Sequence, residues 1–251
     1  MVEGLDRFAD HFSEFSDQYA LIGGAACDLA MQAAAQPFRV TKDLDIVLCL
    51  ESLSGDFVES FWSFVRDGVY RSQEREGGQR QFYRFMKPQT PGFPAMLELF
   101  ARMPDALHFE GQGHLTPIPM TDAISSLSAI LLDTDYYGWI QAGKQIRQNV
   151  SIVRPEHLIP LKAKAWLDLT DRKRSGGHVN SADIKKHKND VFRLVAIADP
   201  EYSVVIPGTI ARDMAAFASR MATEKIDLKS LGITGVTQEE MLAQLQGLYG
   251  S

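Results

Sequence analysis

Hydrophobic residues in the first part of the chain follow two different spacings. Apolar residues at helical spacing, or runs rich in helix-favouring residues, predict helices over residues 5–17, 25–35 and 57–69. Short apolar runs that stop at turn-forming residues predict strands over residues 19–22, 45–50, 81–86 and 95–101. Two further runs, residues 127–132 and 149–154, are also interpreted as strands. The alternation of the two element types predicts an α/β arrangement.

At Pro155 the pattern becomes helical throughout. Pro155 and Glu156 suit the first turn of a helix, because proline has a helical φ and a carboxylate favours the positive end of the helix dipole. Helical periodicity continues over residues 158–169, 181–198, 210–221 and 237–248. Ser181 is expected to cap the second of these helices. We therefore expect an α+β protein with an α/β domain at residues 1–153 and a helical domain at residues 154–251.

The composition is that of a globular protein large enough to bury a core. The chain has 251 residues, of which 45% are hydrophobic and 23% charged. Its apolar runs stay well below the roughly 20 residues that cross a bilayer, so no membrane span is expected. The N-terminus is acidic without an apolar segment, which does not suit a secretory signal. Cys27 and Cys49 form no CxxC pair, which favours a cytoplasmic location and excludes a cysteine zinc site.

Charge is distributed unevenly along the chain. The net charge of -6 argues against a general nucleic-acid coat. Between Lys162 and Arg193, however, nine Lys and Arg residues stand against four Asp residues. Such a segment is typical either of a phosphate-facing surface or of a solvated pair of helices, and the charge pattern alone leaves both interpretations open.

Two aspartates at the start of an apolar run are the first candidate for chemistry. Asp43 and Asp45 are two positions apart, so a strand places both side chains on the same face. Two adjacent carboxylates repel each other unless a cation lies between them, and Mg²⁺ prefers oxygen ligands of this kind. The pair precedes its hydrophobic run, whereas the D-x-D of haloacid-dehalogenase-type phosphatases follows one. The order of these residues therefore weakens a phosphatase interpretation.

Two other features add to the aspartates. Glu98 lies in an otherwise apolar run, where a carboxylate is costly to bury unless it is paired or binds a metal; the alternative is an edge-strand residue facing water. Gly23 and Gly24 lie between a predicted strand and a predicted helix, where a phosphate can approach the backbone; the alternative is an ordinary tight turn. The glycines match neither the dinucleotide-binding fingerprint nor a Walker loop.

Together these features resemble one superfamily. A hydrophobic residue followed by Gly23-Gly24, and later by Asp43-Leu-Asp45-Ile, resembles the nucleotidyltransferases with a polymerase-β-type palm. The segment Arg39-x-Thr41-x-Asp43-Leu-Asp45 is most similar to the AbiEii/AbiGii-type, MenT-like toxin nucleotidyltransferases. Residues 155–165 and 181–194 are similar to two helices of the same group, in the same order.

The resemblance also has departures. Eighteen residues separate Gly24 from Asp43, more than the usual spacing, and Gly24 stands where a serine is common. The last acidic position of the family matches either Asp183 or Asp190, which lie seven residues apart on one helix face. The resemblance implies a small mixed-sheet palm with flanking helices, followed by a helical bundle.

The resemblance implies a reaction and a set of residue roles. Asp43, Asp45 and Glu98 would hold one or two Mg²⁺ (or Mn²⁺) ions that bridge a nucleoside triphosphate, with Glu98 alternatively a base for the acceptor hydroxyl. The nucleotide would contact Gly23 and Gly24 through its phosphates, and also Thr41, Lys162, and Asp183 or Asp190. An NMP would pass from the NTP to an acceptor, with pyrophosphate as the second product.

The acceptor and the partners follow from the subfamily alone. Toxin-type relatives nucleotidylate tRNA within toxin–antitoxin or phage-defence systems, so tRNA and a cognate antitoxin are the expected partners. A small acceptor is the alternative, as in antibiotic-modifying nucleotidyltransferases. A catalytically inactive binding module on the same fold and a D-x-D glycosyltransferase also remain open, although the glycosyltransferase would leave Gly23, Gly24 and Lys162 without a role.

Overall fold

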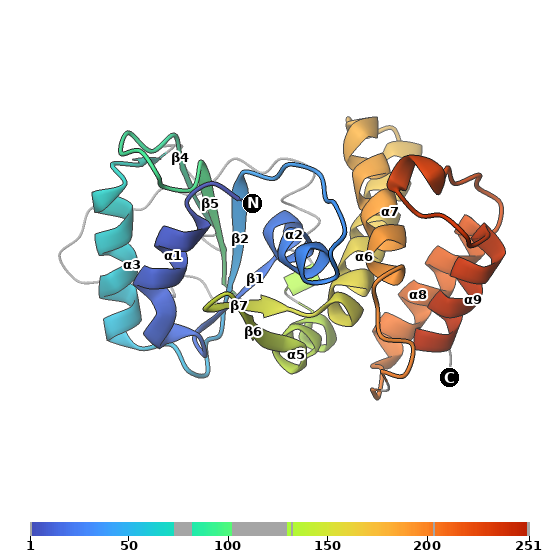
Figure 1. Ribbon diagram of the computed structural model, residues 1–251, viewed down its shortest axis with the longest axis horizontal. Helices are drawn as coiled ribbons and strands as arrows, with labels where there is room; N and C mark the ends of the chain where they lie inside the picture. Colours follow the sequence, from blue (N-terminus) through green and yellow to red (C-terminus); the bar gives the residue numbers. More distant parts are fainter. Residues whose placement is uncertain (1, 73–81, 102–129, 132, 203, 250–251) are drawn as a thin grey trace. The chain divides into compact units, whose positions relative to one another are not determined.

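The computed structural model describes residues 2–72, 82–101, 130–131, 133–202 and 204–249. It divides into two compact units (Figure 1). The sheet unit contains Met1–Leu29, Phe38–Met120 and Lys144–Val153; the helical unit contains Ala30–Pro37, Thr121–Gly143 and Arg154–Ser251. The helical unit thus takes in two segments, residues 30–37 and 121–143, that the sequence prediction assigned to the domain at 1–153.

The described part of the sheet unit contains one mixed sheet of seven strands, in the order β3-β4-β5-β2-β1-β7-β6. The strands are β1 (Tyr19–Ile22), β2 (Asp43–Leu48), β3 (Arg71–Ser72), β4 (Phe82–Met86), β5 (Met96–Phe100), β6 (Lys144–Arg147) and β7 (Val150–Val153). β2 runs parallel to β5 and antiparallel to β1, and β1 runs parallel to β7. With the helices, this mixed sheet confirms the predicted α+β class.

Burial along the central strands explains their sequences. β1 and β7 are buried at every position, as expected of strands inside a sheet that is covered on both faces. In β2 the buried residues start as an alternation, with Asp43 and Asp45 half-buried and Leu44 buried between them. The strand therefore begins two residues before the predicted run and carries both aspartates on one face.

An aromatic cluster holds the first helices of the sheet unit together. It joins α1 (Leu5–Phe12) to α3 (Gly55–Asp67) through rings that include Phe8, Phe12 and Phe64, with the Phe12 and Phe64 centroids 5.4 Å apart. Tyr19 of β1 meets Phe8 edge to face at 5.4 Å. Truncating one such buried ring to alanine costs about 3–5 kcal/mol, so the cluster contributes much of the stability of this unit.

The remaining helices complete both units. α2 (Gly23–Ala33) follows β1 directly, and the single-turn 3₁₀ helix η1 (Ser13–Phe15) follows α1. The helical unit holds α5 (Thr134–Ala142), α6 (Pro155–Arg174), α7 (Ser181–Val195), α8 (Gly208–Met221), the 3₁₀ helix η2 (Lys229–Leu231) and α9 (Gln238–Tyr249). α6 is its centre, packing against both α7 and α8. Within this core Trp166 of α6 meets Phe217 of α8 edge to face at 5.3 Å.

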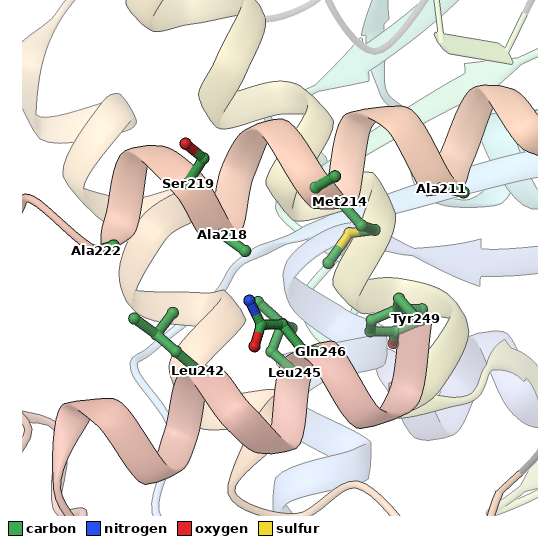
Figure 2. A pocket seen from close by; sticks show the side chains of 10 residues that line it. Ala211, Met214, Ala218, Ser219, Ala222, Leu242, Leu245, Gln246 and Tyr249 are labelled. Atoms are coloured by element: carbon green, nitrogen blue, oxygen red, sulfur yellow. The ribbon is translucent and has the colours of Figure 1, made fainter. Parts of the chain in front are cut away.

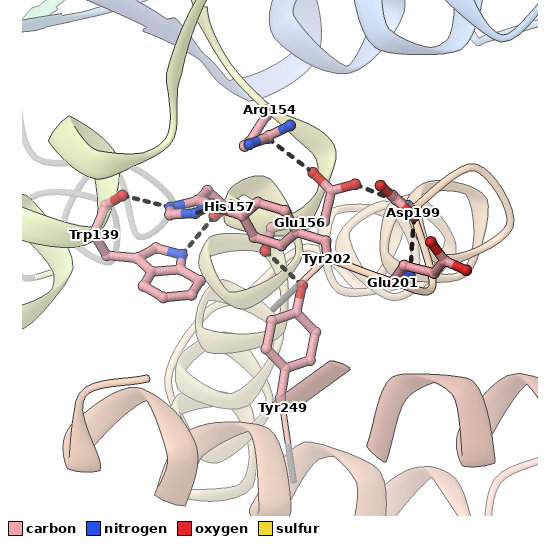
Figure 3. A network of polar contacts seen from close by, with 8 residues as sticks. All are labelled: Trp139, Arg154, Glu156, His157, Asp199, Glu201, Tyr202 and Tyr249. Atoms are coloured by element: carbon pink, nitrogen blue, oxygen red, sulfur yellow. Dashed lines mark hydrogen bonds and ion pairs between the residues drawn. The ribbon is translucent and has the colours of Figure 1, made fainter. Parts of the chain in front are cut away.

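A buried polar network fixes the start of α6 (Figure 3). The imidazole of His157 is fully buried and stacks on the Trp139 indole at 3.9 Å. Its Nδ1 lies 2.6 Å from the Trp139 carbonyl, and its Nε2 lies 2.7 Å from the Tyr202 hydroxyl. Next to it, the Glu156 carboxylate accepts from the Asp199 amide at 2.9 Å, while Tyr249 donates to the Glu156 carbonyl. His157 is therefore a structural residue of the helical unit.

Several predicted elements need correction. Ser181 is not the cap of α7: the side chain of Asn180 caps this helix, accepting from the Ala182 amide at 2.9 Å. Ile130 and Leu131, in the predicted strand at 127–132, are helical, and the rest of that segment lies outside the described residues. The sequence pattern also missed β3, β6 and α5, which are short or carry no regular apolar spacing.

His157 makes the stability of the helical unit depend on pH. Burial lowers the pKa of His157 below its ordinary value of 6.5. Below about pH 6.5 the unfolded chain takes up a proton that the folded one does not, so this contribution to stability is lost as pH falls toward the lowered pKa. We expect the free-energy advantage of wild type over His157→Gln to shrink by up to about 1.4 kcal/mol per pH unit in this range.

Urea unfolding at several pH values between about 7.5 and 5.5 measures this difference. His178→Gln, at an exposed position, serves as the control and should leave the pH dependence of wild type unchanged. An unchanged difference between wild type and His157→Gln across the range would contradict the assignment of His157 as a neutral, buried residue.

Candidate functional site

Three charged residues form a row across neighbouring strands of the sheet unit. Asp45 of β2 pairs in register with Glu98 of β5, and Glu98 pairs in register with Arg84 of β4. Directly paired residues of adjacent strands project from the same face of a sheet, and Asp43 shares the face of Asp45 on β2. The structure therefore brings the three carboxylates of the sequence prediction to one face, and it adds Arg84, which the sequence analysis did not identify.

The carboxylate of Asp45 lies against the first residue of helix α2. Ile22, the last residue of β1, pairs in register with Asp45, and the helix begins at the next residue, Gly23. Gly23 has a φ of 65°, and a Cβ at this position would overlap the Asp45 carboxylate. Glycine is thus required here both by its backbone conformation and by the space that the aspartate occupies. The sequence prediction placed Gly23 in a turn before the helix; it is instead the first helical residue.

A hydroxyl and a cation lie at the same end of α2. A Cβ at Gly24 would overlap the Thr41 hydroxyl and would lie 3.5 Å from a guanidinium nitrogen of Arg39. The N-terminus of a helix attracts anions through its unpaired amides and its dipole. Thr41 and Arg39 therefore add a hydrogen-bond donor and a positive charge to an end of the helix that already favours a phosphate. Arg39 belongs to the motif noted in the sequence, but only its position beside Gly24 reveals this role.

Glu98, predicted from the sequence to bind a metal, is paired with an arginine in the structure. Its carboxylate accepts from Nε of Arg84 at 2.6 Å and forms an ion pair with a second nitrogen of the same guanidinium. Among the described residues, no three His, Cys, Asp or Glu side chains are arranged so that they could hold a metal ion. Asp43 and Asp45 still fit a divalent cation, because two carboxylates on one strand face supply the hard oxygen ligands that Mg²⁺ prefers.

Lys162 and Asp190 meet within the helical unit. Nζ of Lys162 on α6 lies 3.3 Å from the carboxylate of Asp190 on α7, with side chains that are 6% and 0% exposed. Arg193 approaches the same carboxylate at 3.7 Å. Asp183, the alternative for the last motif, is half-buried in the first turn of α7. Of the two aspartates, Asp190 is therefore the one paired with the predicted triphosphate-binding lysine.

Ion pairs occupy much of the basic segment at 162–193. Lys164 pairs with Asp168 at 3.0 Å and lies 3.7 Å from Asp213, while Lys188 pairs with Glu224. Other pairs join Lys162 and Arg193 to Asp190, and Arg174 to Asp171. Carboxylates from inside and outside the segment therefore offset a large part of its positive charge.

Two hollows in the described part of the helical unit are lined by none of the predicted site residues. An apolar groove of about 420 Å³ lies between α8 and α9, lined by Met214, Leu245 and Tyr249 among others (Figure 2). A polar cleft of about 590 Å³ is lined by residues including Lys164 and Asp213. Burial and the contact with Asp213 raise the pKa of Tyr136, which lines this cleft and donates to Asp213 at 2.9 Å.

None of the helices in the described part of the chain combines the length and the apolar character needed to cross a membrane.

Comparison with known proteins finds a distant structural likeness. No family model matches the chain, and none of the curated proteins matches it either. Among solved structures, the chain is similar to the crystal structure of an antigenic nucleotidyltransferase-like protein from Paracoccidioides brasiliensis. The two are 16% identical with a TM-score of 0.46, over 92% of this chain and 93% of that one.

The contact between Gly23 and Asp45 predicts that alanine substitution destabilises the protein far more at Gly23 than at Gly55, the first residue of another helix. Gly23→Ala places a side chain into the Asp45 carboxylate at a positive φ, and we expect it to destabilise the protein by about 1–3 kcal/mol. Gly55→Ala, at the first residue of α3, meets nothing within 4 Å and should change stability by less than about 0.5 kcal/mol. Urea unfolding compares the two variants; equal stabilities would contradict the described contact.

Proposed function

We propose that this chain is a nucleotidyltransferase, which moves an NMP from a nucleoside triphosphate to an acceptor hydroxyl. The observation that carries this proposal is the close approach of the Asp45 carboxylate to Gly23 at the start of α2. In the proposal, Asp43 and Asp45 bind a cation, and the N-terminus of α2 binds an anion. A triphosphate with its divalent metal presents both charges at once, so it suits this junction.

Each residue at the junction has a defined task in the proposal. Asp43 and Asp45 would hold Mg²⁺ (or Mn²⁺), which when bound neutralises charge on the phosphates and orients them. Gly23 and Gly24, lacking side chains, leave the amides at the helix N-terminus accessible to phosphate oxygens. Thr41 donates a hydroxyl hydrogen bond beside them. These assignments agree with the roles that the sequence resemblance implies for the same residues.

Arg39 supplies positive charge to the proposed nucleotide site of the sheet unit. The guanidinium of Arg39 lies at the start of α2 and can pair with phosphate oxygens through two donors. The resemblance assigns Lys162 to the triphosphate, and the ion pair with Asp190 holds its ammonium in a defined position on α6. Asp190, rather than Asp183, is therefore the aspartate that we propose to accompany Lys162 in that role.

The acceptor is proposed from the resemblance, which points to tRNA and to a toxin-type enzyme with a cognate antitoxin. A small acceptor molecule is a second candidate. Asp213 and Glu224, from outside the segment, approach two of its lysines and so lower the positive charge available to a polyphosphate acceptor there.

Asp45→Asn tests the nucleotide site directly. The substitution removes a charge from the proposed metal site with little change in size, so Mg²⁺-dependent binding of the cognate NTP should weaken by at least about tenfold. Isothermal titration calorimetry of the four NTPs, with and without Mg²⁺, measures this effect. Asp56→Asn, at an exposed position in the first turn of α3, is the matched control and should bind like wild type. Absence of Mg²⁺-dependent NTP binding in wild type would contradict the proposal.

The NTP that binds in this experiment is then used as the labelled donor to identify the acceptor. Wild type is incubated with that NTP, labelled at the α-phosphate, and with either total tRNA or a panel of small hydroxyl-bearing molecules. Label on RNA, with binding that weakens steeply as salt rises, supports the tRNA acceptor; label on a small molecule supports the second candidate. NTP binding without transfer to either acceptor class would favour the inactive binding module.

A further inference from the structure

Glu98 lies between two partners that compete for its charge. On one side it pairs in register with Asp45, whose carboxylate belongs to the proposed cation site. On the other it pairs with Arg84, whose Nε donates to Glu98 Oε1 at 2.6 Å. The side chains of Arg84 and Glu98 are only 16% and 11% exposed, so solvent screens this ion pair weakly.

The contact with Arg84 reduces what Glu98 can offer a metal. A guanidinium that donates two hydrogens to a carboxylate forms a strong, charge-assisted interaction and neutralises the negative charge. A divalent ion bound to the same carboxylate would also lie close to the guanidinium, and the two positive charges would repel each other.

We propose that Arg84 is a positioning residue that competes with the divalent metal for Glu98. While Arg84 holds Glu98, the metal is bound by Asp43 and Asp45 alone, and Glu98 becomes a ligand only when the guanidinium moves away. This inference takes one element from the proposed function, the binding of a divalent metal by Asp43 and Asp45. It assigns Arg84 a role in setting metal affinity beyond that of a cross-strand ion pair that stabilises the sheet.

A double-mutant cycle on metal binding tests the competition without measuring activity. Mn²⁺ alone, without nucleotide, is titrated into wild type, Arg84→Gln, Glu98→Gln and the double variant, and free Mn²⁺ is followed by electron paramagnetic resonance. Arg84→Gln releases Glu98 and should bind Mn²⁺ about tenfold more tightly than wild type. The double variant should return to the wild-type affinity, because the gain requires the Glu98 carboxylate.

Two controls separate this effect from a general change of charge or of fold. Arg71→Gln removes an exposed arginine from the neighbouring strand β3 and should leave Mn²⁺ affinity unchanged. Circular dichroism reports folding. If Arg84→Gln does not fold, Arg84→Lys replaces it, because lysine keeps the charge but lacks the planar fork, and it should give a smaller gain of about threefold.

The inference is overturned if the Arg84 variant binds Mn²⁺ no more tightly than wild type does. It is also overturned if neither protein binds Mn²⁺. A gain that persists in the double variant also overturns it. The outcome is independent of the nucleotide experiments. If Arg84→Gln raises the Mn²⁺ affinity in a Glu98-dependent way but the protein binds no NTP, the inference stands and the proposed function fails. If the protein binds NTP but Arg84→Gln does not raise the Mn²⁺ affinity, the proposed function stands and the inference fails.

Discussion

The contact between the Asp45 carboxylate and Gly23 is the constraint on which the candidate site depends. Register pairing of Ile22 with Asp45 fixes the aspartate beside the end of β1, and the chain enters α2 at the next residue. Only a residue without a side chain can occupy that position at a φ of 65° beside the carboxylate. Strand pairing therefore places a negative side chain at the positive end of a helix dipole, an arrangement worth about 0.3–1 kcal/mol at exposed positions and up to ~2 where it is partly buried.

The same face of the sheet has to balance several like charges. Asp43, Asp45 and Glu98 project from neighbouring positions, and like charges paired directly across strands destabilise a sheet. Arg84 offsets this repulsion at Glu98, and Arg39 brings a second guanidinium to the start of α2. One cation of the chain thus pairs with Glu98, and another lies at the start of α2. Bound metal would add to a site that the protein has already partly neutralised, which is why metal affinity and arginine position are expected to be linked.

The helical unit shows why the chemistry of Lys162 cannot be separated easily from its structural role. Lys162 and Asp190 are both buried, and removing one partner of a buried ion pair leaves an uncompensated charge that costs about 3–5 kcal/mol. A loss of activity after a change at Lys162 alone would therefore combine lost function with lost stability. The network around Glu156 and His157 is a similar case, because the His157 imidazole and one carboxylate oxygen of Glu156 have specific partners in other segments of the unit.

Local sequence was sufficient for most elements and for the identity of the candidate residues. β1 and the helices α3, α6, α8 and α9 lie close to their predicted ranges, because their apolar spacing reflects burial of one face or of a whole strand. Asp43, Asp45, Glu98, Gly23 and Gly24 stood out because they are charged or glycine residues within or at the ends of apolar runs. The α+β class followed from the order of these elements.

Tertiary structure alone decided which of these residues meet and what else joins them. The pairing of β5 with β2 brings Glu98 beside Asp45 across more than fifty residues of sequence, and the pairing of β4 with β5 brings Arg84 to Glu98. The burial of Asp190 against Lys162, the cap supplied by Asn180 and the place of Arg39 beside Gly24 also depend on long-range or backbone geometry. A linear pattern records which face of an element is buried, but strand register and side-chain partners are set by the packing of segments far apart in the chain, and that information has no local signature.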